Sequence, residues 1–196
     1  AGTIDSHENG VPEANSHKAM IVGGANVTFG NEEALRKALG FEYWTMAEPL
    51  DEDLQVPHDG LKVSGKLVYP LFHNNDASIY VGTGIEFERW RRNSPEDSTL
   101  QWGDLYSADC FLEIGGDYKD KYNLRFGINW PFWTDTDSGH QPKGKLGFTV
   151  YSSVSLTENL RIGPFYEVVG FEREGSQPPL EVEFYGLQFI YTLPNK

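Results

Sequence analysis

The sequence predicts an all-β protein: an antiparallel up-and-down β-barrel of about eight strands with an N-terminal accessory segment. The first observation behind this prediction is that apolar residues alternate with small or charged ones over long segments, as in Ser78 to Trp90. Successive side chains of a strand point to opposite faces, so this period of two gives each strand one apolar face. The second is composition: 14% aromatic residues and 21 glycines favour strands and turns.

The first part of the chain does not follow this regular pattern. Residues 1–17 are polar and aperiodic, which predicts a mobile tail, and residues 18–29 are strand-like. Residues 31–40 start with an Asn in N-cap position and end in Gly, which predicts a short helix. The alternative is a turn followed by a strand from Leu39 onward. We therefore divide the chain into an accessory segment, residues 1–37, and a barrel domain, residues 38–196.

The rest of the chain is a regular series of strand candidates. They fall at residues 38–47, 60–73, 77–91, 104–117, 121–134, 144–156, 159–173 and 181–193. The connections between them alternate between short turns and long polar loops. Short turns on one rim and long loops on the other are typical of outer-membrane barrels, whose turns lie on the periplasmic side.

Alternation alone does not say which face is wet, but volume does. An eight-stranded barrel has an interior only just wide enough for side chains, and five bulky residues per strand would overfill it. We therefore expect the apolar face to point to lipid and the glycine-rich, charged face to point to the lumen. Apolar residues at some lumen positions, such as Val169 and Phe171, indicate either a dry region inside or a register shift of one residue in the last strands. The alternative is a soluble barrel that binds an apolar small molecule among Trp44, Phe111, Phe165 and Phe184.

Two sets of residues follow from this orientation as candidate sites. Charges inside a barrel must pair, because an unpaired buried charge costs several kcal/mol. The predicted lumen charge network consists of Glu42, Lys62, Lys66, Glu86, Glu88, Asp109, Glu113, Arg125, Arg161 and Glu167. Aromatic rings also gather at the lipid headgroup level. The predicted membrane-interface aromatics are Tyr43, Tyr69, Phe87, Trp90, Tyr106, Trp130, Phe132, Tyr166, Tyr185 and Tyr191.

The alternating segments 78–90, 122–133 and 145–156 and the closing segment 183–193 resemble those of small outer-membrane β-barrels of Gram-negative bacteria. That class includes the transmembrane domain of outer-membrane protein A and opacity-type, porin-like barrels. The resemblance is one of pattern over residues 38–193, and it implies a bacterial outer-membrane location. The chain departs from the class at its end, Thr192 to Lys196, because the family usually ends on an aromatic residue.

Several function classes are excluded or disfavoured. A net charge of −13 argues against nucleic acid as a partner. We find no catalytic motif, no metal-ligand cluster and no cofactor fingerprint. Glu86 and Glu88 share a face as acid–base catalysts do, but acids two residues apart are common on strands. A lipid-acting barrel enzyme is the third alternative, and the His-x-Ser pair of lipid A deacylases is absent from late strands.

We thus expect a non-enzymatic outer-membrane barrel. Its partners would be outer-membrane lipid and another protein, bound through the N-terminal segment or the long polar loops. The expected role is structural, adhesive or partner-binding, with weak passage of small solutes as a further expectation.

Overall fold

The structure is a computed structural model that describes residues 2–8, 16–30, 34–46, 57–92, 104–137, 141–172 and 180–191. These residues form ten strands and no helix, and so none of them forms a helix able to cross a membrane. The strands are β1 (Gly2–Glu8), β2 (Ser16–Phe29), β3 (Arg36–Met46), β4 (Pro57–His73), β5 (Ala77–Arg92), β6 (Leu105–Tyr118), β7 (Tyr122–Thr136), β8 (Lys143–Ser155), β9 (Leu160–Glu172) and β10 (Leu180–Tyr191).

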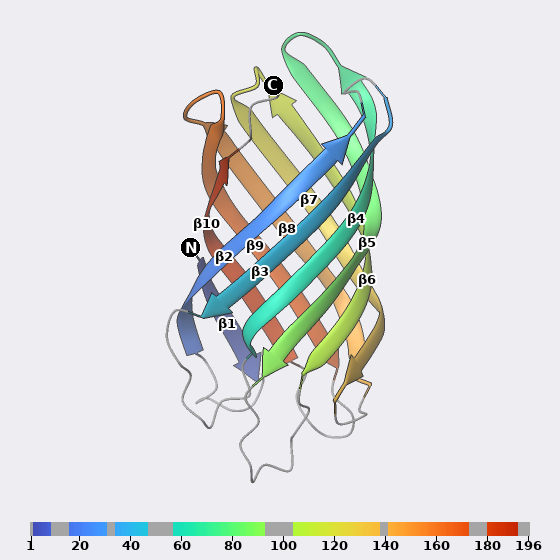
Figure 1. The fold of residues 1–196 in the computed structure, drawn as a ribbon, viewed down its shortest axis with the longest axis vertical. Coiled ribbons are helices and arrows are strands. Elements are labelled where there is room, and N and C mark those ends of the chain that lie inside the picture. Colours follow the sequence, from blue (N-terminus) through green and yellow to red (C-terminus); the bar gives the residue numbers. More distant parts are fainter. Residues whose placement is uncertain are drawn as a thin grey trace.

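The ten strands form one closed antiparallel barrel (Figure 1). Each strand pairs with its neighbours in the sequence, and β1 closes the ring by pairing with β10 as well as with β2. The predicted up-and-down barrel is thereby confirmed. Its eight predicted strands correspond to β3 through β10, and the N-terminal segment adds β1 and β2.

The N-terminal segment is therefore part of the barrel, which corrects three predictions. Gly2–Glu8, predicted as a mobile tail, is a strand, because its backbone completes the ladder between Leu180–Gly186 and Ser16–Met20. The expected boundary after residue 37 does not separate two units, since β2 pairs with β3 along ten residue pairs. The predicted helix at 31–40 is absent from its described part: β3 starts at Arg36, in agreement with the alternative of a turn and a strand.

The two rims differ as predicted, and their turns have identifiable causes. Asn74 Oδ1 accepts hydrogen bonds from the backbone N–H groups of Asp76 and Ala77 at 2.9 and 2.7 Å, which fixes the β4–β5 turn. The β6–β7 turn places Lys119 and Asp120 at φ of 53° and 50°, the left-handed conformation of a two-residue hairpin. These turns lie at the upper end in Figure 1, with the C-terminal end of β10. The C-terminal ends of β3 and β5 lie at the opposite end.

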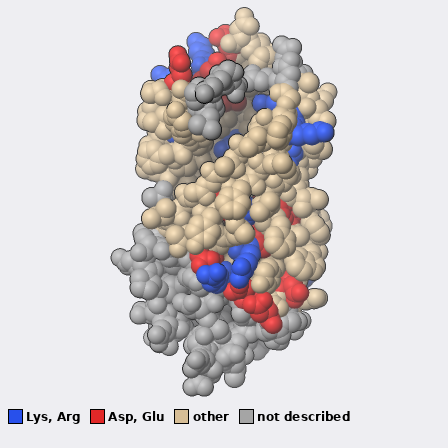
Figure 2. Space-filling model, in the orientation of Figure 1, with Lys and Arg blue, Asp and Glu red and all other residues tan. Residues whose placement is uncertain are grey.

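The outside of the barrel is apolar. Among the described residues 32 large hydrophobic side chains are exposed and 11 are buried, the reverse of what a water-soluble core requires. Ile85 and Leu124 on the outer face are 58% and 60% exposed. Figure 2 shows a broad band of uncharged residues across the middle of this face, with Lys, Arg, Asp and Glu mostly gathered toward its two ends. The predicted orientation, with the apolar face outward, is the one the structure has.

Glycines on the inner face let other groups approach the strands closely. A Cβ on Gly84 would lie 2.0 Å from the Gly65 carbonyl oxygen and 2.8 Å from the Phe111 ring. On Gly147 it would lie 2.2 Å from Asn129 Oδ1. Both contacts are shorter than atoms allow, so these positions have room only for hydrogen. Glycine at these positions therefore lets neighbouring strands and their side chains approach closely.

The wall is incomplete near the short-turn end. The pairs of β1 stop at Met20 on β2 and at Gly186 on β10. Within the described ranges, the β2 edge from Ile21 to Phe29 has no strand on its β1 side. Figure 1 shows β2 and β10 diverging above the N-terminus, and Figure 2 shows a hollow in that region.

Candidate functional site: the barrel lumen

The inward face of the strands brings together the charged residues that the sequence singled out. Strand pairing places all ten on this face, in register with one another, as in Glu42 opposite Lys62 and Lys62 opposite Glu88. The lumen contains, from the long-loop end to the short-turn end, an apolar layer, a layer of carboxylates around Lys62, a second charged layer and an open mouth.

Lys62 is the centre of the carboxylate layer. Its Nζ lies 2.6 Å from Glu88 Oε1, 2.8 Å from Glu167 Oε1 and 3.9 Å from Glu86 Oε1. Lys62 is on β4 and Glu167 is on β9, and these strands lie on opposite sides of the ten-strand ring. The ion pair therefore crosses the lumen. A lysine side chain can reach the opposite wall only because the lumen is narrow at this level. The ion pair therefore narrows the interior further.

The two carboxylates nearest Lys62, Glu88 and Glu167, also accept hydrogen bonds from neutral donors. Trp90 Nε1 donates to Glu88 Oε2 at 2.8 Å, and the Tyr151 hydroxyl donates to Glu167 Oε2 at 3.3 Å. Glu86 and Glu88, considered as a catalytic pair, are thus not equivalent, because Glu88 is 2% exposed with both oxygens in use. Among the described residues no three Asp, Glu, His or Cys side chains are grouped so as to hold a metal ion.

The second charged layer lies closer to the short turns. Lys66 pairs with Glu113 and also lies 5.7 Å from the centre of the Tyr80 ring. Arg125 stacks at 4.9 Å over the Tyr151 ring, a favourable position for a cation. The lysine and arginine of this layer thus have partners of their own.

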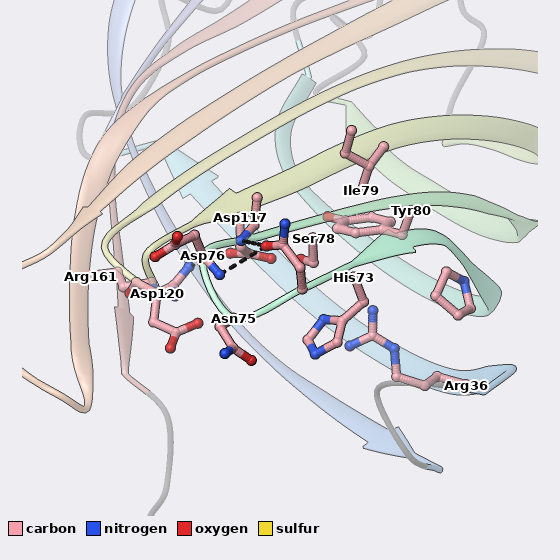
Figure 3. A pocket seen from close by; sticks show the side chains of 13 residues that line it. Arg36, His73, Asn75, Asp76, Ser78, Ile79, Tyr80, Asp117, Asp120 and Arg161 are labelled. Atoms are coloured by element: carbon pink, nitrogen blue, oxygen red, sulfur yellow. Dashed lines mark hydrogen bonds and ion pairs between the residues drawn. The ribbon is translucent and has the colours of Figure 1, made fainter.

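The mouth at the short-turn end holds a pocket of about 130 Å³ (Figure 3). Arg161 and Asp120 lie at one side of it, and Tyr80 and Arg36 at the other. The Arg161 guanidinium pairs with Asp117 at 3.0 Å. The lining is polar and open, which suits hydrated solutes at an entrance better than a tightly bound ligand.

The opposite end of the lumen is filled by apolar side chains, named the apolar plug. Its buried members are Met20, Trp44, Trp90, Leu105, Val169, Phe171, Val182 and Phe184. The ring centres of Trp90 and Phe171 lie 5.5 Å apart, and Trp44 is 6.3 Å from Trp90, all edge to face. Trp90 and Phe171 come from β5 and β9, far apart around the ring, so the plug spans the lumen. The buried apolar residues of β9 and β10 thus form a dry region, and β10 pairs with β9 without a register shift.

The plug also corrects one predicted site residue and bears on one alternative. Trp90 does not face the lipid interface, because it points inward with Glu86 and Glu88 and is 2% exposed. The other nine predicted interface aromatics face outward. Trp44 and Phe184 pack against each other at 5.5 Å and themselves fill the space that an apolar ligand would need, with Phe165 packed against the plug. Sequence reasoning missed Met20, Leu105 and Val182, which share the inward register of Trp44, Trp90 and Phe184.

The sequence matches no protein-family model and no curated protein. One solved structure, described as "KdgM porin", is similar across 98% of this chain and 98% of its own chain, at 14% sequence identity and a TM-score of 0.29. A similarity of this size identifies no function, so function has to be derived from the side chains of the barrel itself.

The role of Lys62 is tested by Lys62→Met, which keeps an unbranched side chain of nearly the same length and removes the charge. We expect the free energy of unfolding to fall by about 3–5 kcal/mol, because Glu88 and Glu167 lose their shared cation while buried. The measurement is urea unfolding in detergent micelles. Lys143→Met is the control, since its partner Glu172 is 3.5 Å away and both side chains are at least half exposed; it should change the free energy by less than about 0.5 kcal/mol. Equal effects of the two substitutions would show that Lys62 does not hold the layer together.

Proposed function

We propose that this chain is a non-enzymatic β-barrel of a bacterial outer membrane, with a structural or partner-binding role and an occluded lumen. The observation that carries the proposal is the exposed apolar outer face of a closed sheet. In lipid every backbone polar group must be satisfied within the protein, and a closed antiparallel sheet is one of the two structures that achieve this. In water the exposure of so many large apolar side chains would be unfavourable.

Occlusion of the lumen is supported by two successive layers. The apolar plug and the Lys62–Glu167 ion pair both span the interior. Solute passage is therefore weak unless both layers move. The pocket with Arg36 and Arg161 lies at the short-turn end, outside both layers. The long loops that the sequence analysis connects with partners lie mostly outside the described residues.

Leu112→Arg tests whether the outer face meets lipid. Leu112 lies in the middle of β6 and is 50% exposed. An Arg near the bilayer midplane costs about 2–4 kcal/mol on the lipid face of a barrel, falling to about 0–1 near the interfaces. In phospholipid vesicles we expect the free energy of unfolding to fall by about 2–4 kcal/mol for Leu112→Arg. For Tyr118→Arg, at the rim, we expect a fall of about 0–1 kcal/mol. Two nearly neutral substitutions would contradict a lipid-facing belt.

A second role, partner binding, is favoured by the β2 edge from Ile21 to Phe29. Backbone groups along an open edge are a template for an added strand, and in lipid they need hydrogen-bond partners. A strand from another protein chain would supply them. Inward residues of this edge, such as Asn26, are exposed, in keeping with an unfilled position in the wall.

Ala25→Cys tests this second role in a Cys110→Ser background. Ala25 lies on the β2 edge, and its partner Phe41 lies one strand further from the gap. In outer membranes we expect a short thiol-to-amine crosslinker to give a discrete adduct with a second chain from Ala25→Cys and none from Phe41→Cys. Adducts from neither position, or from both equally, would argue against strand addition at β2.

A further inference from the structure

The carboxylate layer carries more negative charge than its own cation balances. Five carboxylates come together on the inward face, and Lys62 is the cationic side chain that contacts three of them within the described residues. The five are Glu42, Glu86, Glu88, Asp109 and Glu167. The layer lies between the apolar plug and the second charged layer, whose Lys66 pairs with Glu113 instead.

The imbalance is concentrated at Asp109. Its side chain is 0% exposed, and neither carboxylate oxygen has a hydrogen-bond partner among the described residues. Across the β5–β6 ladder Asp109 lies directly opposite Glu86, which is 3.9 Å from Lys62 Nζ, too far for a hydrogen bond. Two carboxylates are thus cross-strand neighbours on the inward face, and the Lys62 ammonium group is already bound to Glu88 and Glu167.

One neutral oxygen, the Ser107 hydroxyl, lies beside Asp109. Ser107, two residues from Asp109 on the same face, is 2% exposed with its hydroxyl unpaired among the described residues. Asn129 on β7 is 3% exposed, and its amide groups also have no hydrogen-bond partner among the described residues, but its oxygen points toward Gly147 on β8. On β7 it is the inward residue next to Pro131, the partner of Asp109. Carboxylate, hydroxyl and amide oxygens are the ligands that hard cations prefer.

Electrostatics favours the binding of a cation beside these two carboxylates. A buried charge is retained only when it is paired, and two like charges opposite each other in a low-dielectric interior repel strongly. A second positive charge between Asp109 and Glu86 would remove both penalties. The protein supplies no such side chain among its described residues.

We propose that the lumen binds a monovalent alkali cation between Asp109 and Glu86, with Ser107 as an additional oxygen ligand. A partly hydrated Na⁺ or K⁺ fits better than a tightly coordinated divalent ion, because no cage of three acidic side chains is formed among the described residues. This inference goes beyond the proposed function: it concerns the interior alone and holds whether or not solutes pass through the barrel.

The test is the thermal unfolding of the full chain in a zwitterionic detergent, with Na⁺, K⁺, Ca²⁺ or N-methyl-D-glucamine as the chloride salt at equal ionic strength. A cation that binds the folded state stabilises it by mass action. A Na⁺ concentration of ten times the dissociation constant should therefore raise the midpoint of thermal unfolding by roughly 3–6 °C over that in N-methyl-D-glucamine. The rise should increase with Na⁺ concentration. Equal midpoints in Na⁺, K⁺ and N-methyl-D-glucamine, or a rise in Ca²⁺ alone, would overturn the proposal.

Two variants locate the site. Asp109→Asn should lose the Na⁺ dependence, and in N-methyl-D-glucamine its midpoint should be at or above that of the wild type, because repulsion with Glu86 is relieved. Asp117→Asn is the matched control, since Asp117 also faces the lumen but pairs with Arg161; it should keep the Na⁺ dependence. Retained dependence in Asp109→Asn would overturn the assignment.

If Asp109→Asn does not fold, ²³Na NMR of the wild type decides the question. Saturable line broadening that K⁺ displaces and N-methyl-D-glucamine does not displace would support the site. Its absence would overturn the proposal. Failure of the membrane proposal would leave both measurements interpretable, because neither uses a bilayer.

Discussion

Closure of an antiparallel sheet imposes one constraint on which every other feature of this barrel depends. Side chains alternate across the sheet, so each strand has to serve an interior and an exterior at once. The exterior is unlimited in size, and the interior is a narrow cylinder. Bulky residues such as Leu124 and Trp130 therefore point outward, and the inner face carries glycine and side chains that pair across short distances.

The interior is filled in separate layers because a charged group packed against apolar side chains loses its hydration at a large cost in free energy. At the long-loop end the apolar plug excludes water, and Trp90 joins it to the charged layer through its bond to Glu88. Lys62 then crosses to Glu167 on the opposite wall. The same layering leaves Asp109 without a cation of its own. Occlusion, charge excess and the narrow lumen are thus three consequences of one packing problem.

Much of this could be predicted from the sequence, because a period of two is a strong signal and the inner volume of a barrel is limited. The eight strands from β3 to β10, the outward apolar face and the inward position of the lumen charges all follow from it. Gly2–Glu8 could not be recognised as a strand, since its sequence does not alternate and its pairing depends on both ends of the sheet meeting. Trp90 was misplaced for another reason: residue type suggested an interface, whereas its register with Glu86 and Glu88 already placed it inside. The carboxylates that bind Lys62 could not be predicted, because distances across the lumen cannot be read from a local sequence pattern.

The measurement that tests the lipid-facing outer surface most directly is tryptophan quenching in two single-tryptophan variants, one retaining Trp130 and one retaining Trp90. Trp130 is 62% exposed on the outer face and Trp90 is 2% exposed in the plug. In vesicles with brominated acyl chains we predict strong quenching of Trp130, little quenching of Trp90, and little quenching of either by aqueous iodide. Quenching of Trp130 by iodide and not by brominated lipid would contradict a membrane-embedded barrel.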